Sequence, residues 1–168
     1  NAMSISPSVL EEQSLESWKE NFKVTLDAAF IGTKYVLPLM RKNKRGAIVN
    51  VSSVVGFRGT PYLAAYGAAK AGLISLTQTS AIEAAPNVRV NCVAPGAVMT
   101  PATKTALPSK ELREETSKTI PLKRIAEPNE IASIIAFLLS DESSYLTGIC
   151  IAADGGKTID LNAGISME

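Results

Sequence analysis

Three short apolar runs, separated by segments long enough to form helices, constrain the fold of this chain most strongly. They are AIVNVS at 47–52, VRVNCV at 88–93 and ICIAA at 149–153. Runs of this length and composition are typical of strands that are covered on both faces of a sheet. Strands that are joined by long helices pair in parallel through right-handed crossovers. The sequence therefore predicts a layered α/β domain with a parallel sheet.

The segments between these runs have the patterns of helices. Over 15–41, large apolar side chains recur every three or four residues, and an alanine-rich helix is predicted from about 62 to 84. A third, apolar helix is predicted over 130–139. Residues 97–120 form a polar segment with one short helix near 109–118. The length of 168 residues fits one domain, because domains commonly hold about 100 to 200 residues.

Ligands of open parallel sheets bind beyond the carboxyl ends of the strands. In this chain the first strand is followed by Ser53, and the second ends at Pro95 and Gly96. Tyr66 lies near the start of the helix that follows the first strand, and Lys70 lies one turn further on. We expect these five residues to converge on one rim of the sheet.

The stretch YGAAKAG at 66–72 suggests what that rim could do. The chain has no histidine, so acid/base chemistry near neutral pH must use carboxylates, lysine, tyrosine or cysteine. Residues four apart share a helix face, and an ammonium about 4 Å from a phenolate attracts it by about 4 kcal/mol at a dielectric near 20. We therefore expect Lys70 to lower the pKa of Tyr66 toward neutral pH. The alternative to a catalytic pair is an ordinary pair of residues on a helix surface, which would have the same spacing.

Composition excludes several classes of function. The net charge of +1 does not favour a nucleic acid partner, and no run approaches the roughly 18 apolar residues of a membrane span. Cys92 and Cys150 lie in apolar runs and are expected to be buried thiols, too few for a disulfide scaffold or a zinc site. Asp154-Gly155-Gly156 more often closes a strand than binds a metal, so no metal is predicted. We expect a cytoplasmic protein without a secretion signal.

Three segments resemble the C-terminal two thirds of a short-chain dehydrogenase/reductase. They are VNVSSVVGFRGTPYLAAYGAAKAG, VRVNCVAPGAVMT and LTGICIAADGG. The resemblance implies that Ser53 orients the substrate oxygen and that Tyr66 is the general acid/base. It also implies that Lys70 lowers the pKa of that tyrosine and holds the nicotinamide ribose.

The resemblance also assigns the other side of the site. Pro95, Gly96, Val98 and Thr100 match the segment that contacts the nicotinamide carboxamide, and 97–120 matches the mobile substrate lid. The implied fold is a partial doubly wound parallel sheet of the Rossmann type, with its last strand within 147–156. The implied cofactor is NAD or NADP, and the implied reaction is hydride transfer with a small carbonyl or alcohol substrate.

Two positions depart from the family pattern. The family has an asparagine in its long helix where this chain has Thr25. The resemblance thus assigns Thr25 a catalytic role in place of that asparagine, and the change leaves the proton relay in doubt. The glycine-rich turn that binds the cofactor pyrophosphate has no counterpart, so NAD and NADP are not distinguished. Residues 1–3 are either a tag remnant before a native Met3 or the end of a clipped family turn.

The resemblance therefore predicts a single partial domain over 1–168 that lacks its first strands. We expect the activity of these residues alone to be impaired and the chain not to be a stable monomer, because an apolar strand edge would be exposed. A homo-oligomer would form through the helices at 15–41 and 62–84, as in the family. The competing hypothesis is a non-catalytic truncated homologue that serves as an oligomerisation or interaction module.

Overall fold

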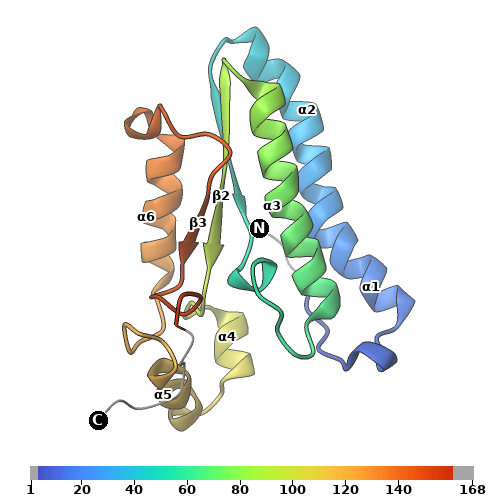
Figure 1. Ribbon diagram of the computed structural model, residues 1–168, viewed down its shortest axis with the longest axis vertical. Coiled ribbons are helices and arrows are strands. Elements are labelled where there is room, and N and C mark those ends of the chain that lie inside the picture. Colours follow the sequence, from blue (N-terminus) through green and yellow to red (C-terminus); the bar gives the residue numbers. More distant parts are fainter. Residues whose placement is uncertain (1–3, 161–168) are drawn as a thin grey trace.

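The computed structural model describes residues 4–160, so the two interpretations of residues 1–3 fall outside it. Its sheet contains β1 (Gly46–Val51), β2 (Val88–Pro95) and β3 (Cys150–Ala153), in the order β1-β2-β3. Both pairings are parallel, with Asn50 opposite Cys92 and Cys92 opposite Cys150. The predicted parallel α/β arrangement is thus confirmed (Figure 1).

Helices cover the sheet on both sides (Figure 1). On one side lies a long rod formed by α1 (Leu15–Phe22), the π-helix η2 (Lys23–Asp27) and α2 (Ala28–Lys42), beside α3 (Ala64–Ala84). On the other side lies α6 (Pro128–Leu139). Three single turns of 3-10 helix, η1 (Leu10–Glu12), η3 (Val54–Gly56) and η4 (Asp141–Ser143), complete the connections.

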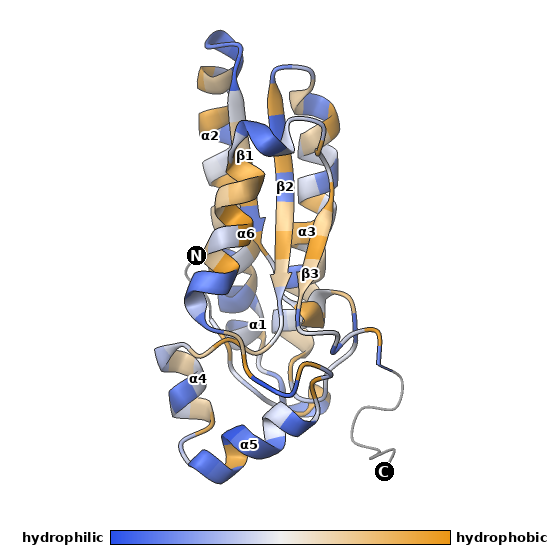
Figure 2. Cartoon of the chain, turned by 90° about the vertical axis from the view of Figure 1, so that its left-hand side faces the viewer, coloured by the Kyte–Doolittle hydropathy of each residue, from blue (hydrophilic) through white to orange (hydrophobic). Residues whose placement is uncertain are grey.

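The polar segment after β2 contains two helices where the sequence predicted one. The helix near 109–118 is present as α5 (Lys110–Lys118), but α4 (Pro101–Ala106) was not predicted. The Thr100 side chain caps α4 by accepting a hydrogen bond from the Thr103 amide, and Pro101 occupies its first turn. Figure 2 shows that α5 is mainly hydrophilic, whereas the strands are largely hydrophobic.

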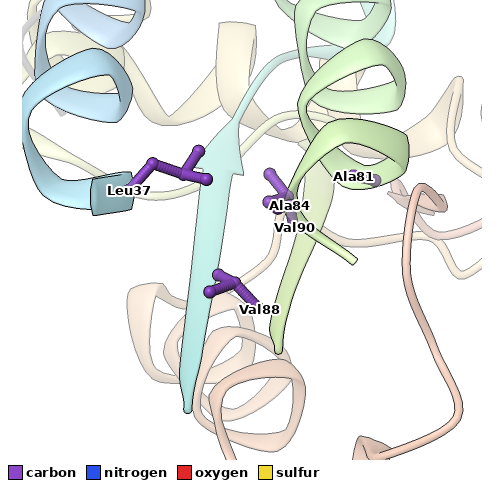
Figure 3. Packing of buried hydrophobic residues seen from close by; sticks show 5 residues of the cluster. All are labelled: Leu37, Ala81, Ala84, Val88 and Val90. Atoms are coloured by element: carbon purple, nitrogen blue, oxygen red, sulfur yellow. The ribbon is translucent and has the colours of Figure 1, made fainter. Parts of the chain in front are cut away.

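The core has two parts, one on each face of the sheet. The first lies between α2, α3 and the strands, where Leu37, Ala81, Ala84, Val88 and Val90 pack together (Figure 3). The second lies under α6, where Val93, Ile131 and Leu138 form the buried centre. The central strand β2 is therefore covered on both faces, which explains its nearly continuous apolar sequence, whereas β3 packs under α6 and leaves Ala152 exposed.

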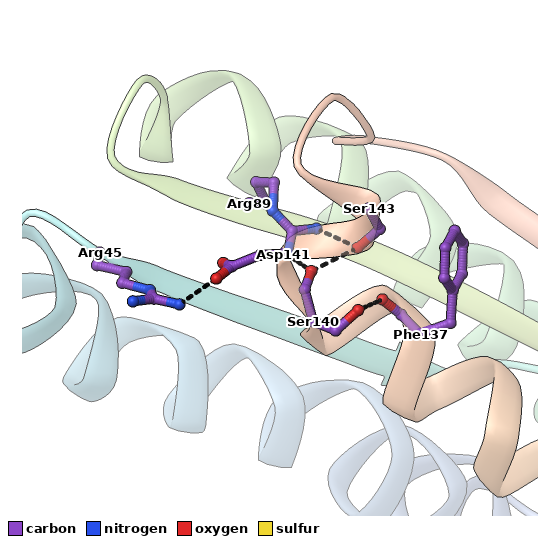
Figure 4. A network of polar contacts seen from close by, with 6 residues as sticks. All are labelled: Arg45, Arg89, Phe137, Ser140, Asp141 and Ser143. Atoms are coloured by element: carbon purple, nitrogen blue, oxygen red, sulfur yellow. Dashed lines mark hydrogen bonds and ion pairs between the residues drawn. The ribbon is translucent and has the colours of Figure 1, made fainter.

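An arginine on β2 holds the C-terminal end of α6 (Figure 4). The Arg89 guanidinium donates hydrogen bonds to the carbonyl oxygens of Leu138, Ser140 and Leu146, and to the Ser143 hydroxyl. The last carbonyls of a helix have no partner within the helix, so Arg89 supplies donors that α6 lacks. In the described part of the chain, no helix is long and apolar enough to cross a membrane.

Candidate functional site

A cavity of about 520 Å³ opens at the carboxyl ends of β1 and β2. Seven of the eight residues predicted for the site line it: Ser53, Tyr66, Lys70, Pro95, Gly96, Val98 and Thr100. The eighth, Thr25, does not. The expectation that residues from the ends of two strands and the start of one helix meet at one rim agrees with the structure.

Ser53 is held at this rim by the turn that follows β1. Its hydroxyl accepts a hydrogen bond from the Val55 amide at 3.4 Å and caps the 3-10 turn η3. This leaves the hydroxyl proton of Ser53 free to be donated to another oxygen. Gly56 lets the turn approach α3 closely, since a Cβ there would lie 3.0 Å from the Lys70 carbonyl carbon. A larger residue would push Ser53 away from α3.

Tyr66 and Lys70 lie on the same buried face of α3, as their spacing predicts. The Lys70 Nζ lies 5.5 Å from the centre of the Tyr66 ring and donates a 2.7 Å hydrogen bond to the Val51 carbonyl oxygen. In return, the Ser52 hydroxyl donates to the Lys70 carbonyl at 2.8 Å. This reciprocal pair of bonds joins the end of β1 to α3 and fixes the lysine over the tyrosine ring.

The expected effect of Lys70 on the Tyr66 pKa is not what the structure gives. Burial raises the pKa of Tyr66 above its ordinary value of 10, and the Ser53 hydroxyl opposes this rise only in part. Burial also lowers the pKa of Lys70. The sequence argument placed the ammonium beside the phenol oxygen, whereas Nζ is directed to the Val51 carbonyl and lies over the ring. Desolvation of the phenol therefore sets the direction of the shift, and the Ser53 hydroxyl opposes it.

The segment after β2 forms the opposite wall of the cavity. Gly96 continues the sheet by donating its amide proton to the Ala153 carbonyl at 3.0 Å, and Val98 pairs with Ala126 in an isolated parallel bridge. The Thr100 hydroxyl lies 3.1 Å from the Thr103 hydroxyl besides capping α4. Much of its hydrogen-bonding capacity is thus used within the protein.

Thr25 lies in the π-helix η2, away from the cavity lining. It is buried, and its hydroxyl oxygen has no hydrogen-bond partner among the described residues; the same holds for the side-chain oxygen of Asn21, one turn earlier. The Asn21 amide nitrogen donates to the Ser17 carbonyl at 2.9 Å. The catalytic role assigned to Thr25 stays a prediction.

Several lining residues were not predicted: Ile5, Val55, Leu63, Thr103, Pro128 and Ile131. A signal existed for Pro128 and Ile131, because helices that connect parallel strands begin near the carboxyl ends of those strands. For Ile5 the sequence offered none. Its segment is tied to the loop before α3 by a 3.0 Å hydrogen bond from the Ser8 amide to the Tyr62 carbonyl.

The cysteines and acidic groups provide no metal site among residues 4–160. Cys92 and Cys150 are both free thiols; Cys92 is fully buried, as predicted, and Cys150 is half-buried. Asp154 closes β3 by accepting hydrogen bonds from the Gly156 amide and from the amide and hydroxyl of Thr158. The expectation that this Asp-Gly-Gly stretch ends a strand agrees with the structure.

Comparison with known proteins gives consistent results. A family model described as Enoyl-(Acyl carrier protein) reductase matches residues 1–158. The 3-oxoacyl-[acyl-carrier-protein] reductase FabG of Thermotoga maritima is 47% identical over 160 residues, which cover 95% of this chain and 64% of that protein. Cyclopentanol dehydrogenase of Comamonas testosteroni is 37% identical over 159 residues, covering 94% of this chain and 64% of that protein. The chain thus spans less than two thirds of the length of these relatives.

Solved structures share the fold. The ligand-free aldohexose dehydrogenase of Thermoplasma acidophilum superposes with a TM-score of 0.93 at 33% identity, over 100% of this chain and 69% of that one. Levodione reductase gives 0.90 at 33% identity, over 95% of this chain and 64% of that one. A structure described as ElxO with NADP bound gives 0.89 at 30% identity, over 95% and 66%.

Proposed function

Because this chain belongs to the short-chain dehydrogenase/reductase family, we propose that it acts in hydride transfer between a nicotinamide cofactor and a carbonyl or alcohol substrate. The observation that carries the proposal is the meeting of the Ser53 hydroxyl, the Tyr66 phenol and the Lys70 ammonium in one cavity at the carboxyl edge of the sheet.

In the reductive direction, a carbonyl oxygen of the substrate lies between the hydroxyls of Ser53 and Tyr66. A nicotinamide cofactor held beside these residues would supply the hydride for the new C–H bond at the carbonyl carbon. Tyr66 donates its phenolic proton to the oxygen as the C=O π bond breaks, and Ser53 donates a hydrogen bond that stabilises the developing negative charge. The Lys70 ammonium stabilises the phenolate that remains.

The residues present fit the nicotinamide end of such a cofactor. Pro95, Gly96 and Val98 offer an apolar wall for a flat ring, and the Thr100 hydroxyl lies at its edge. Lys70 uses one ammonium proton on the Val51 carbonyl, so further protons are free for hydroxyl groups of a sugar. Either NAD or NADP meets these requirements, and the proposal covers both.

A substitution test separates this mechanism from a merely structural role of the tyrosine. With NADH or NADPH and a ketone, we expect Tyr66→Phe to lower kcat by about 100-fold or more, the usual contribution of a positioned acid. Tyr62→Phe is the matched control, because Tyr62 precedes the same helix but is 60% exposed and does not line the cavity. Equal rates for the two variants would overturn the assignment of Tyr66.

A second candidate function is an oligomerisation or interaction module. It is favoured by the large apolar side chains that α2 leaves exposed, which are Phe30, Ile31, Tyr35 and Leu39. We propose that α2 and α3 carry a homo-oligomer interface in either case. Light scattering that finds a monomer of 17.7 kDa would refute the interface. An absence of thermal stabilisation by millimolar NADH and NADPH would favour the module over the enzyme.

A further inference from the structure

The lining of the cavity is mainly apolar, and this bears on the substrate. Given the proposed function, we infer that the substrate is an uncharged ketone or secondary alcohol whose reacting carbon carries apolar substituents. Besides Ser53, Tyr66 and Lys70, the lining includes the apolar side chains of Ile5, Val55 and Leu63.

These three apolar side chains come from separate segments. Ile5 belongs to the N-terminal segment that Ser8 ties to the Tyr62 carbonyl, Val55 belongs to η3, and Leu63 precedes the first turn of α3. All three are incompletely buried, and Ile5 is 40% exposed. A substrate that covered these side chains would remove apolar surface from water, which favours apolar substituents.

The polar groups of the cavity offer little to a charged substituent. The hydroxyls of Thr100 and Thr103 lie 3.1 Å apart and contact each other. Among the described lining residues, Lys70 is the only charged one, and its ammonium is bonded to the Val51 carbonyl. Lys70 follows Leu63 by seven residues, which is about 10 Å along a helix axis. A carboxylate on a substituent that covers Leu63 would thus be desolvated without a partner.

The nearest basic side chain of the η3 loop does not change this conclusion. Arg58 is exposed and lines a neighbouring hollow of about 300 Å³, which shares Val55 and Leu63 with the cavity. A short acidic substituent would have to leave the cavity to reach it. Arg58 is therefore the side chain through which an acidic substrate would be recognised if the inference were wrong.

The test compares ketones that differ only in charge. We would measure kcat/KM of the full chain for ethyl acetoacetate against acetoacetate, and for cyclohexanone against 4-oxocyclohexanecarboxylate. The neutral member of each pair should be preferred by about 100-fold or more, because burying an unpaired carboxylate is costly. Ile5→Lys should reduce this preference at least about tenfold. Ile82→Lys, at an 80% exposed position outside the cavity lining, and Arg58→Gln should leave it unchanged.

The outcomes separate the inference from the function on which it rests. Equal kcat/KM for charged and neutral ketones, or a preference for the charged ones that Arg58→Gln abolishes, would overturn the inference and leave the oxidoreductase function standing. Turnover of no ketone with either cofactor would refute the proposed function. In that case saturation-transfer NMR with the same four ketones still decides the inference: transfer to the neutral ones alone supports it, and any other pattern refutes it.

Discussion

Replacement of Arg89 tests how α6, whose first turn lines the cavity, is held against the sheet. Arg89 Nη1 donates to the carbonyl oxygen of Leu138 at 3.0 Å, to the Ser143 hydroxyl at 2.9 Å and to the Leu146 carbonyl at 3.4 Å. Its Nη2 donates to the Ser140 carbonyl at 2.9 Å. The change Arg89→Met keeps an unbranched apolar stem and removes all four donor contacts.

The loss of stability depends on which hydrogen-bond donors the carbonyls retain in the variant. A hydrogen bond from a charged donor contributes about 1.5 to 3 kcal/mol, so four such bonds would overstate the loss. The Ser143 hydroxyl stays within 3.0 Å of the Leu138 and Ser140 carbonyls, and the Asn91 amide still donates to the Leu146 carbonyl at 2.8 Å. The one Ser143 hydroxyl proton can serve only one of those two carbonyls, and the Ser143 amide donates to the Ser140 carbonyl at 3.4 Å. Each carbonyl thus keeps a donor, so the variant should lose about 3 kcal/mol, the equivalent of one or two such bonds.

The matched control lies in the same view of the structure (Figure 4). Arg45 pairs with Asp141 at 2.6 Å, but the two side chains are 78% and 81% exposed, so Arg45→Met should cost less than about 1 kcal/mol. Urea unfolding followed by circular dichroism measures both variants at one protein concentration. With a slope near 2 kcal/mol per molar urea, the midpoint of Arg89→Met should fall by about 1.5 M. A midpoint equal to that of Arg45→Met would refute the reasoning, because the Arg89 contacts would then be worth no more than a surface pair.

Three further predictions follow from the described geometry. Because burial raises the pKa of Tyr66, its contribution to stability is full below pH 10 and is lost as the pH rises through the pKa of the folded state. The difference in phenolate absorbance between the chain and Tyr66→Phe should therefore have a midpoint above pH 10. A midpoint below pH 10 would contradict this prediction. The Arg124 guanidinium lowers the pKa of Glu130 from 4.5 to about 2, so this pair supports the fold above pH 4.5 and its support disappears between pH 4.5 and about 2; carbon-detected NMR titration should find this value, and Arg124→Gln should return it toward 4.5. Gly155→Ala should lower the free energy of unfolding by about 1 to 3 kcal/mol, because φ is +63° and a Cβ would lie 2.7 Å from Ile120, whereas Gly59→Ala, with nothing within 4 Å, should be neutral within about 1 kcal/mol in the same urea assay.

The parts of the fold that sequence reasoning predicted are those set by local pattern. The three apolar runs became the three strands, and a strand that must be covered on both faces has few other sequences available to it. The location of the site was predicted from topology alone, because the residues that follow parallel strands meet at one edge of the sheet. The 101–106 helix was missed although Thr100 and Pro101 are a cap and a first-turn residue, since one and a half turns produce no apolar period.

The rest depended on contacts between distant segments. Ile5 reaches the cavity because the Ser8 amide donates a hydrogen bond to the Tyr62 carbonyl. No local sequence pattern around either residue predicts that contact. Nothing in the sequence assigned Arg89 a role beyond its strand. Its guanidinium nevertheless binds carbonyls at and after the end of α6, which lie 49 to 57 residues further along the chain. Burial of the tyrosine has the same origin, because it is set by everything that packs around α3.

The pKa of Tyr66 is raised by burial, where the sequence predicted that Lys70 would lower it, and this difference bears on the proposed mechanism. A phenol whose pKa is lowered to neutrality could give or take a proton with equal ease, which suits a reaction that runs in both directions. A phenol whose pKa is raised by burial stays protonated at neutral pH, so in the proposed mechanism Tyr66 begins as a proton donor to a carbonyl oxygen. In the same proposal Lys70, held over the ring by the Val51 carbonyl, acts once the proton has left, when a negative charge first exists for it to stabilise. An ammonium that stabilises the charge that develops during the reaction more than the neutral starting state would lower the barrier to the reaction.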